Sequence, residues 1–455
     1  MKPIVFLSNF HPLLTRNILN SGVLESLSSE SSRVIIFVFK KHENHFKKIY
    51  QNNNIIVEGI DIDYFIKGPK NRLFSRISDW LLDTNVRKFR KLENLERTGN
   101  RARYYFSRIF TWFFGKIRPF KKLVRFLDYH LNNPKLLEPY FKKYNPDIVF
   151  ATDLFAEYDV LFLKNSRSFG VKNAAMVRSW DNTSSVGYAR FAPDKLIVHN
   201  EIGKEEMSRY HDISGKIIQA CGIPQFEQYL KMKPSSREEF YNRIGADINK
   251  RLVLFAPAGK FFIDTDWQTC QILKDLYYEN KIPQDIQFLI RLHPFNAVDL
   301  SQVEPDSNFI VDITGPAKSE AGVATKVVGE LDDSFYQHIF DSLYYSSLII
   351  NAISSIIVDA AALDKPLITV NFNGWEKNVP TLKSLKRWRL EENQISWMRI
   401  GMTPLVNNKE ELALWINNYL KDPTLHQDKR KNFKDIYCGK FDGKSAERIA
   451  SFVLS

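Results

Sequence analysis

Two adjacent serines, Ser354 and Ser355, lie between an apolar segment and a predicted helix of about two turns. A second apolar segment, 367–370, follows a proline, and the whole stretch predicts one βαβ unit. Backbone amides at a helix start carry partial positive charge, and hydroxyls beside them can donate to phosphate oxygens. The pair therefore predicts a phosphate site, with Asp359 one turn further on to accept from a ribose hydroxyl. The alternative is that Ser354 only caps the helix and Asp359 faces water.

Basic residues stand at the ends of two other predicted strands in the same half of the chain. The apolar segment 252–255 leads into a stretch of small residues that ends in Lys260, and the segment 288–290 leads into Arg291 and His293. Carboxyl ends of parallel strands meet at one edge of a sheet, so these side chains and the two serines are expected to converge. Such an edge suits a diphosphate held without a metal ion.

The first half of the chain offers a second group of polar residues after predicted strands. His11 follows the first strand and is a candidate general base, although a lone loop histidine is more often a surface or packing residue. Trp180, Asp181 and Asn182 follow another strand. Tryptophan can stack on a sugar face and a carboxylate can accept a proton from a sugar hydroxyl, so this loop predicts an acceptor site with Asp181 as base. A turn in which Asp181 and Asn182 bond their own backbone is the alternative.

Short apolar strands alternate with helical segments in both halves, which predicts an α/β fold with parallel sheets. The segments 4–7 and 34–39 are expected to be strands, and 15–28 a single helix between them. A polar stretch places a boundary between an N-terminal domain, 1–233, and a C-terminal domain, 248–432. The remaining residues, 433–455, are expected to form a helical segment that packs back on the first domain.

Composition indicates a large globular protein of two or three domains, with 455 residues of which 44% are apolar. Three cysteines lie far apart, in neither a disulfide nor a metal-ligand pattern, which favours the reducing cytoplasm. No stretch of about 18 apolar residues is uninterrupted by charge, so no segment is expected to span a membrane. The first residues have too short an apolar run for a signal peptide.

Positive charge is concentrated in the segment 67–126. Between Lys67 and Arg125 there are 17 lysines and arginines against four acids, an excess of 13, so the rest of the chain, whose total net charge is +12, is close to neutral. Aromatic residues are interleaved with the cations, which is typical of an element that lies at an anionic membrane surface. The residues expected at the membrane are Arg108, Trp112, Phe113, Phe114 and Lys116. Nucleic acids attract the same residue types, but clustered phenylalanines favour lipid insertion over base stacking. A helical insertion whose aromatics pack on the domain is the other alternative.

The order of these motifs resembles a known superfamily. A strand that ends in Ala-Pro, an Arg-x-His-Pro sequence, a Ser-Ser pair at a helix start and a Lys-Pro-Leu-Ile strand are similar to the GT-B glycosyltransferases. The resemblance is greatest to CDP-glycerol glycerophosphotransferase-like enzymes and related envelope-polysaccharide transferases, and is strongest from Leu196 to Pro423. It implies two Rossmann-like domains that face each other across a cleft. It also implies that Arg291, His293 and the two serines hold the donor's diphosphate.

Two departures from that branch favour a sugar donor over a polyol-phosphate donor. The histidine-glycine loop of the acceptor half is absent, and Asn351 stands where an acidic residue often precedes the serines. The expected activity is transfer of a sugar from a nucleotide sugar to a hydroxyl of a lipid-linked or membrane-nascent glycan, on the inner face of the cell membrane. A CDP-glycerol-type transferase and a non-catalytic relative are the alternatives. The resemblance implies no metal or cofactor, and nucleic acid is not an expected partner.

Overall fold

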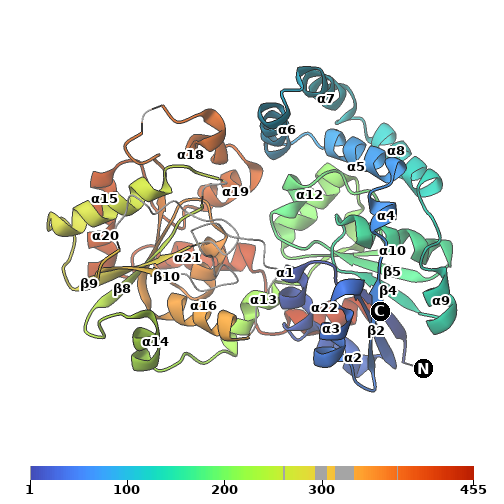
Figure 1. The fold of residues 1–455 in the computed structure, drawn as a ribbon, viewed down its shortest axis with the longest axis horizontal. Coiled ribbons are helices and arrows are strands. Elements are labelled where there is room, and N and C mark those ends of the chain that lie inside the picture. Colours follow the sequence, from blue (N-terminus) through green and yellow to red (C-terminus); the bar gives the residue numbers. More distant parts are fainter. Residues whose placement is uncertain (1, 260–261, 293–304, 313–332, 377) are drawn as a thin grey trace. The chain divides into compact units, whose positions relative to one another are not determined.

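The structure is a computed structural model that describes residues 2–259, 262–292, 305–312, 333–376 and 378–455. The chain divides into two compact units, each built around one parallel sheet (Figure 1). The first unit comprises residues 1–228 and 436–455, and the second comprises residues 229–435. Both units have an α/β architecture, as the alternation of strands and helices predicts.

The first unit contains a seven-stranded sheet in the order β3-β2-β1-β4-β5-β6-β7, with every pairing parallel. Its strands are β1 Ile4–Ser8, β2 Arg33–Phe39, β3 Ile55–Ile60, β4 Ile148–Ala151, β5 Lys172–Met176, β6 Lys195–Val198 and β7 Ile218–Ala220. Its helices are α1 Pro12–Leu14, α2 Val23–Glu30, α3 Glu43–Tyr50, α4 Asp63–Ile66, α5 Pro69–Leu81, α6 Asn85–Thr98, α7 Arg101–Phe114, α8 Arg118–Leu131, α9 Glu138–Tyr144, α10 Glu157–Ser168, α11 Asn182–Ser185, α12 Glu201–His211, α13 Pro224–Glu227 and α22 Ser445–Leu454.

The second unit contains a six-stranded sheet in the order β10-β9-β8-β11-β12-β13, again with every pairing parallel. Its strands are β8 Arg251–Ala256, β9 Ile286–Arg291, β10 Phe309–Asp312, β11 Ser346–Asn351, β12 Leu367–Val370 and β13 Leu405–Val406. Its helices are α14 Arg237–Ile244, α15 Asp266–Tyr278, α16 Asp333–Tyr345, α17 Ile356–Ala362, α18 Leu385–Trp388, α19 Glu392–Ile400 and α20 Lys409–Lys421. Helix α21, Gln427–Tyr437, runs from this unit back into the first.

Both faces of the first sheet are buried, which explains why its strands are almost continuously apolar. Successive residues of β1 point to opposite faces, so Val5 and Leu7 join a cluster that includes α2 and α22, whereas Phe6 packs against Phe37 and Phe141 on the other side. The C-terminal helix α22 thereby completes the core of the first unit (Figure 1).

One predicted element differs from the structure. The segment 15–28 is not a single helix but a π-helical turn, Thr15–Leu19, followed by α2. The break falls at Gly22, whose φ of +89° favours glycine and does not continue a helix. Apolar periodicity alone did not reveal this break, because both parts bury the same side of the segment against β1 and β2.

Candidate functional site

In each sheet the strand order reverses at one point, and ligands of open α/β sheets bind beyond the carboxyl ends of the strands there. In the second unit the reversal lies between β8 and β11, the neighbours at the centre of its sheet. Phe255 pairs with both Ile290 and Ile350, so Arg291 and Asn351 lie one residue further on, at the same edge. Two strand spacings separate their backbones by about 10 Å. The structure therefore brings Arg291 and the serine turn to one edge of one sheet.

The two predicted serines occupy different environments at the start of α17. Ser354 is half-buried, and its Oγ accepts a hydrogen bond of 3.3 Å from the amide of Ile356. Ser355 is exposed and makes no side-chain capping bond to the helix. Its hydroxyl is thus available to a ligand, while that of Ser354 is partly engaged in shaping the turn.

Asn351 holds the turn from beneath. Its Nδ2 donates to the carbonyl of Ser354 at 3.3 Å, and its Oδ1 accepts from the hydroxyl of Thr369 on β12 at 3.1 Å. An acidic side chain has no N–H to donate, so the amide suits this position. Asn351 therefore holds the backbone of the serine turn through its side-chain amide.

A buried arginine that the sequence analysis did not single out ties the ends of β11 and β12 together. The guanidinium of Arg389 donates to the carbonyls of Ala352 and Val370 and to the side chains of Asn371 and Gln394, at 2.8–2.9 Å. Burial lowers its pKa to about 10, which still leaves it charged at neutral pH. Five N–H donors in a fixed plane make arginine suited to bridging two chain segments in this way.

The loop after β8 is held by a buried carboxyl group. Gly259 has a φ of +91°, and its amide donates to Oδ2 of Asp266 at the start of α15 at 2.7 Å. Burial raises the pKa of Asp266 to about 7.

Two predicted phosphate ligands, Lys260 and His293, lie outside the described residues. The predicted ribose ligand Asp359 accepts a hydrogen bond of 2.5 Å from the hydroxyl of Tyr229.

In the first unit the strand order reverses between β1 and β4, and a buried carboxyl pair lies beyond these strands. Asp159 is fully buried and accepts hydrogen bonds from the Ser8 hydroxyl and the Asp153 amide. Its second oxygen has no partner among the described residues, and burial raises its pKa to about 7. Asp153 forms an ion pair of 3.0 Å with Arg178, which follows β5.

His11 lies near the same edge and is a weak base. Its Nδ1 accepts from the amide of Leu13 at 3.1 Å, which leaves the ring proton of the neutral form on Nε2. Burial and the charge of Arg178 lower the pKa of His11 to about 4. The ring is therefore neutral at physiological pH and presents a donor, because its accepting nitrogen is already engaged.

The predicted acceptor loop is ordered by short-range contacts. Asp181 accepts a hydrogen bond of 2.5 Å from the Ser179 hydroxyl and remains half-buried. Trp180 packs edge-on against Tyr437, with ring centroids 5.4 Å apart. The buried Oδ1 of Asn182 has no hydrogen-bond partner within the described chain. Unsatisfied buried acceptors of this kind are uncommon in native proteins, and a bound ligand is one way to satisfy them.

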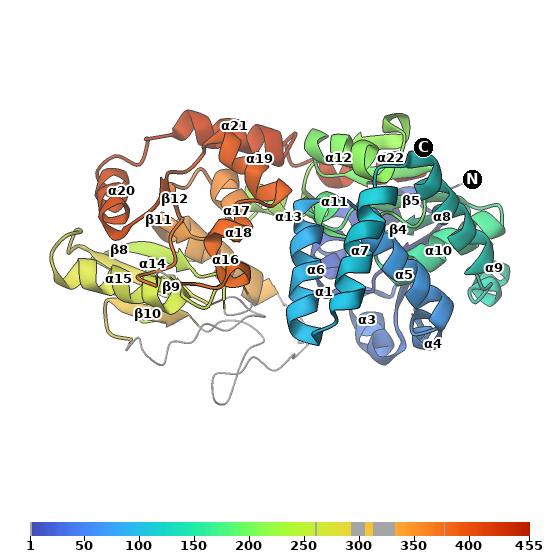
Figure 2. The same cartoon turned by 90° about the horizontal axis from the view of Figure 1, so that it is seen from above.

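The basic, aromatic segment forms four helices, α5 to α8, inserted between β3 and β4 (Figures 1 and 2). Helix α7 buries small polar residues and exposes large apolar ones: Ser107 is 3% exposed and Trp112 is 70% exposed. Its other exposed apolar residues are Tyr105, Phe106, Ile109 and Phe113. In α8 the buried residues are Lys121 and Asp128, whereas Leu123, Phe126, Leu127 and Leu131 are exposed. Water-facing helices have the opposite pattern.

The residues predicted to meet a membrane differ in how exposed they are. Trp112 and Phe113 are exposed, whereas Phe114 is half-buried and stacks on Phe120. Arg108 and Lys116 are exposed cations; Arg108 donates to the Tyr104 hydroxyl at 3.2 Å and Lys116 lies 4.0 Å from Asp83.

Of the described helices, none is both long and apolar enough to cross a bilayer. The described residues likewise contain no group of three or more His, Cys, Asp or Glu side chains arranged for a metal ion.

Comparison with solved structures identifies the fold. The chain is similar to a UDP-GlcNAc 2-epimerase from Neisseria meningitidis, with a TM-score of 0.55 and 10% identity over 99% of both chains. It is similar to a glycosyltransferase from Rickettsia africae ESF-5, with a TM-score of 0.51 and 12% identity over 100% of this chain and 99% of that one. It is also similar to the wall teichoic acid polymerase TagF, with a TM-score of 0.50 and 14% identity over 99% of this chain and 88% of that one. At these identities the likeness establishes the GT-B fold.

Comparison of sequences identifies the family. No curated protein sequence matches the chain. Residues 169–455, more than half of the chain, match the family described as CDP-Glycerol:Poly(glycerophosphate) glycerophosphotransferase. The chain therefore belongs to this family of transferases.

Proposed function

We propose that this transferase moves a sugar from a nucleotide sugar to a hydroxyl group of a lipid-linked or membrane-nascent cell-surface glycan. The observation that carries the proposal is the edge of the second sheet where Arg291 and the turn of Ser354 and Ser355 meet, braced by Arg389. A cation and free hydroxyl and amide donors on rigid strand ends suit the negative charge that develops on a departing nucleoside diphosphate.

The donor's diphosphate is proposed to lie across this edge. The Ser355 hydroxyl would donate to one phosphate oxygen, and the guanidinium of Arg291 would meet another. Lys260 and His293 are proposed as further ligands from the neighbouring loops, and Asp359 as the ribose partner. Fixed donors cost little reorganisation during the reaction, and the Arg389 brace supplies that rigidity at β11 and β12.

A sugar is preferred to glycerol phosphate as the transferred group. Structures with this fold include one described as bound to UDP-GlcNAc and one described as a UDP co-structure of MnaA from S. aureus, so the architecture accommodates uridine nucleotides. The family match favours the second candidate, transfer of glycerol phosphate from CDP-glycerol. The two reactions differ in the leaving group, which is a nucleoside diphosphate for the sugar and CMP for glycerol phosphate.

Asp181 is proposed as the general base. The acceptor hydroxyl would attack the anomeric carbon, the bond to the diphosphate oxygen would break, and the hydroxyl proton would pass to the Asp181 carboxylate. His11 is the second choice, because its accepting nitrogen is engaged and its pKa is low. Trp180 would stack on the acceptor sugar, and the unsatisfied Oδ1 of Asn182 would accept from a hydroxyl of that sugar.

Helices α7 and α8 are proposed to hold the protein on the anionic, cytoplasmic surface of the membrane. Their exposed apolar residues would enter the lipid boundary, and the surrounding cations, including Arg108 and Lys116, would meet lipid phosphates. Each cation near such a surface contributes about 1 kcal/mol. This attachment would keep a lipid-linked acceptor near the enzyme.

Thermal unfolding with a panel of UDP, CDP, GDP, TDP and CMP tests the donor site. A ligand that binds only the folded state raises the melting temperature by an amount that depends on its affinity. A uridine, guanosine or thymidine diphosphate that stabilises more than CMP supports a diphosphate-sugar donor. Stabilisation by the cytidine nucleotides alone would favour CDP-glycerol, and no stabilisation by any of the five would contradict the site.

A further inference from the structure

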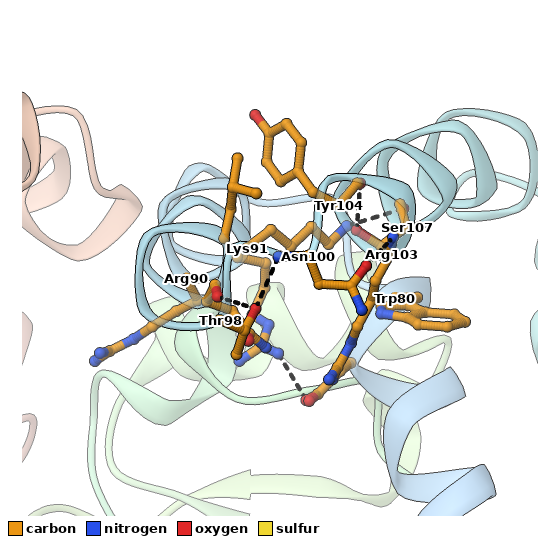
Figure 3. Close-up of a pocket in the computed structure, with 12 residues that line it drawn as sticks. Trp80, Arg90, Lys91, Thr98, Asn100, Arg103, Tyr104 and Ser107 are labelled. Atoms are coloured by element: carbon orange, nitrogen blue, oxygen red, sulfur yellow. Dashed lines mark hydrogen bonds and ion pairs between the residues drawn. The ribbon is translucent and has the colours of Figure 1, made fainter.

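A small polar hollow lies among helices α5, α6 and α7 of the first unit (Figure 3). It has a volume of about 50 Å³, and α6 and α7 supply most of its lining. A single buried water needs about 10–15 Å³ on this measure, so the hollow has room for a group of a few heavy atoms. Four cations line it, Arg87, Arg90, Lys91 and Arg103, against one carboxylate, Asp79.

Two of these cations are neutralised by neighbours. Arg87 forms an ion pair of 2.7 Å with Asp79, and Arg90 forms one of 3.0 Å with Glu93. Lys91 and Arg103 form no ion pair with any carboxylate of the described chain. Two cations without an ion pair therefore line one small space. Arg87 lines the same space, and its Nε is buried and lacks a hydrogen-bond partner among the described residues.

Lys91 is the most unusual of the four, because its side chain is only 9% exposed. Its ammonium group crosses from α6 to α7, where it donates to the carbonyl of Ser107 at 3.4 Å (Figure 3). It also donates to the hydroxyl of Thr111. Both partners are neutral, so nothing in direct contact offsets the cost of burying the charge. Burial, assisted by Arg87, lowers the pKa of Lys91 to about 8.

We propose that this hollow is a binding site for a phosphate group, held by Lys91, Arg103 and the Nε–H of Arg87. A phosphate carries the charge opposite to that of buried Lys91 and exposed Arg103, and its oxygens accept the hydrogen bonds that these side chains offer. The amide of Asn94 also lines the hollow with a buried, unpartnered oxygen, and turning this amide would present its two N–H donors instead. The hollow and the proposed donor site are built from different residues. A failure of the test below would therefore leave the proposed donor site standing, and the reverse also holds.

The phosphate could belong to a lipid headgroup or to a soluble compound, and both present the same chemistry to the hollow. The outward side of α7 carries the exposed aromatic residues, while Asn100, Arg103, Tyr104 and Ser107 face the hollow. Vesicles and free phosphate therefore form separate arms of the test.

The decisive variant is Lys91→Met. Methionine has a similar length, and the single proton of the Thr111 hydroxyl keeps an acceptor, either the carbonyl of Trp80 at 2.5 Å or that of Ser107 at 2.8 Å. The variant should therefore fold with a melting temperature equal to or above that of the wild type. Lys88→Met is the matched control, since Lys88 lies on the same helix, is exposed, and does not line the hollow.

Inorganic phosphate and pyrophosphate are titrated at constant ionic strength, with chloride as reference, and binding is followed by calorimetry. Lys91→Met and Arg103→Gln should each weaken phosphate binding at least tenfold, whereas Lys88→Met should leave it unchanged. Binding to vesicles with phosphatidic acid is then compared with binding to equally charged phosphatidylserine vesicles. This comparison shows whether the bound phosphate belongs to a lipid or to a soluble compound. Weaker binding of Lys91→Met to phosphatidic acid alone indicates a lipid phosphate, and unaltered vesicle binding indicates a soluble one. No phosphate binding by the folded wild type, or equal binding by Lys91→Met, would overturn the proposal.

Discussion

Replacing Ser355 by alanine should weaken nucleotide binding without disturbing the fold. The hydroxyl is exposed and makes no capping bond, so its removal leaves no protein group unsatisfied. A hydrogen bond to a charged group contributes about 1.5–3 kcal/mol. Since about 1.4 kcal/mol corresponds to tenfold, the dissociation constant of the preferred nucleoside diphosphate should rise roughly 10-fold to 150-fold. Calorimetric titration measures this change directly.

Ser354 should behave differently, because its hydroxyl already accepts from the Ile356 amide. Ser354→Ala should lower the free energy of unfolding by about 0.5–1 kcal/mol, the lower part of the range for a lost cap, in addition to any loss of affinity. Ser307→Ala is a suitable control, since Ser307 is exposed and precedes β10 at the opposite edge of the sheet. Unchanged nucleotide affinity in both Ser354→Ala and Ser355→Ala would refute the proposed diphosphate site.

Three further predictions concern the base, the membrane surface and a buried carboxyl group. Asp181→Asn should lower turnover about 100-fold while nucleotide affinity persists. An active Asp181→Asn variant together with an inactive His11→Ala variant would show that His11, and not Asp181, is the general base. Trp112→Ser with Phe113→Ser should reduce sedimentation with anionic vesicles at high salt, whereas Leu414→Ser, an exposed residue of the second unit, should not; equal losses would argue against insertion by α7. The folded-state pKa of Asp159, about 7, lies above its ordinary value of 3.8, so the stability that this group contributes is complete at acid pH and is lost as pH rises through 7. Urea unfolding measures the free energy of unfolding of Asp159→Asn minus that of the wild type. This difference should increase by about 2–3 kcal/mol from pH 5 to pH 8. A difference that does not change with pH would show that the carboxyl group does not titrate in this range.

The α/β class and the two parallel sheets were predictable because the relevant signals are local. Strands such as Leu367–Val370 are short, apolar on both faces and bounded by turn residues. The short helix after Ser355 also followed from its position between two such strands. Gly22 was the exception, because a backbone break inside an apolar periodic segment leaves the pattern of buried positions intact.

The parts of the site that depend on distant contacts were not predictable. Arg389 is separated from Ala352 by 37 residues and resembles any arginine of a polar segment until both strands are in place. Asp153 lies two residues after the apolar residues of β4 and could have been noticed there, but its pairing with Arg178 requires the sheet. The outward aromatic side of α7 follows from helical periodicity only when the side that faces the protein is known, and small residues such as Ser107 and Thr111 do not mark it.

Mass analysis of the product shows whether the protein transfers a sugar or glycerol phosphate. The purified protein is incubated with a membrane-derived glycan acceptor and a mixture of nucleotide sugars and CDP-glycerol, and both the acceptor and the released nucleotide are identified. We expect an acceptor that gains one glycosyl residue together with release of a nucleoside diphosphate. An acceptor that gains glycerol phosphate together with release of CMP would contradict the sugar donor, and neither product nor nucleotide release under conditions where the nucleotide binds would contradict the catalytic role.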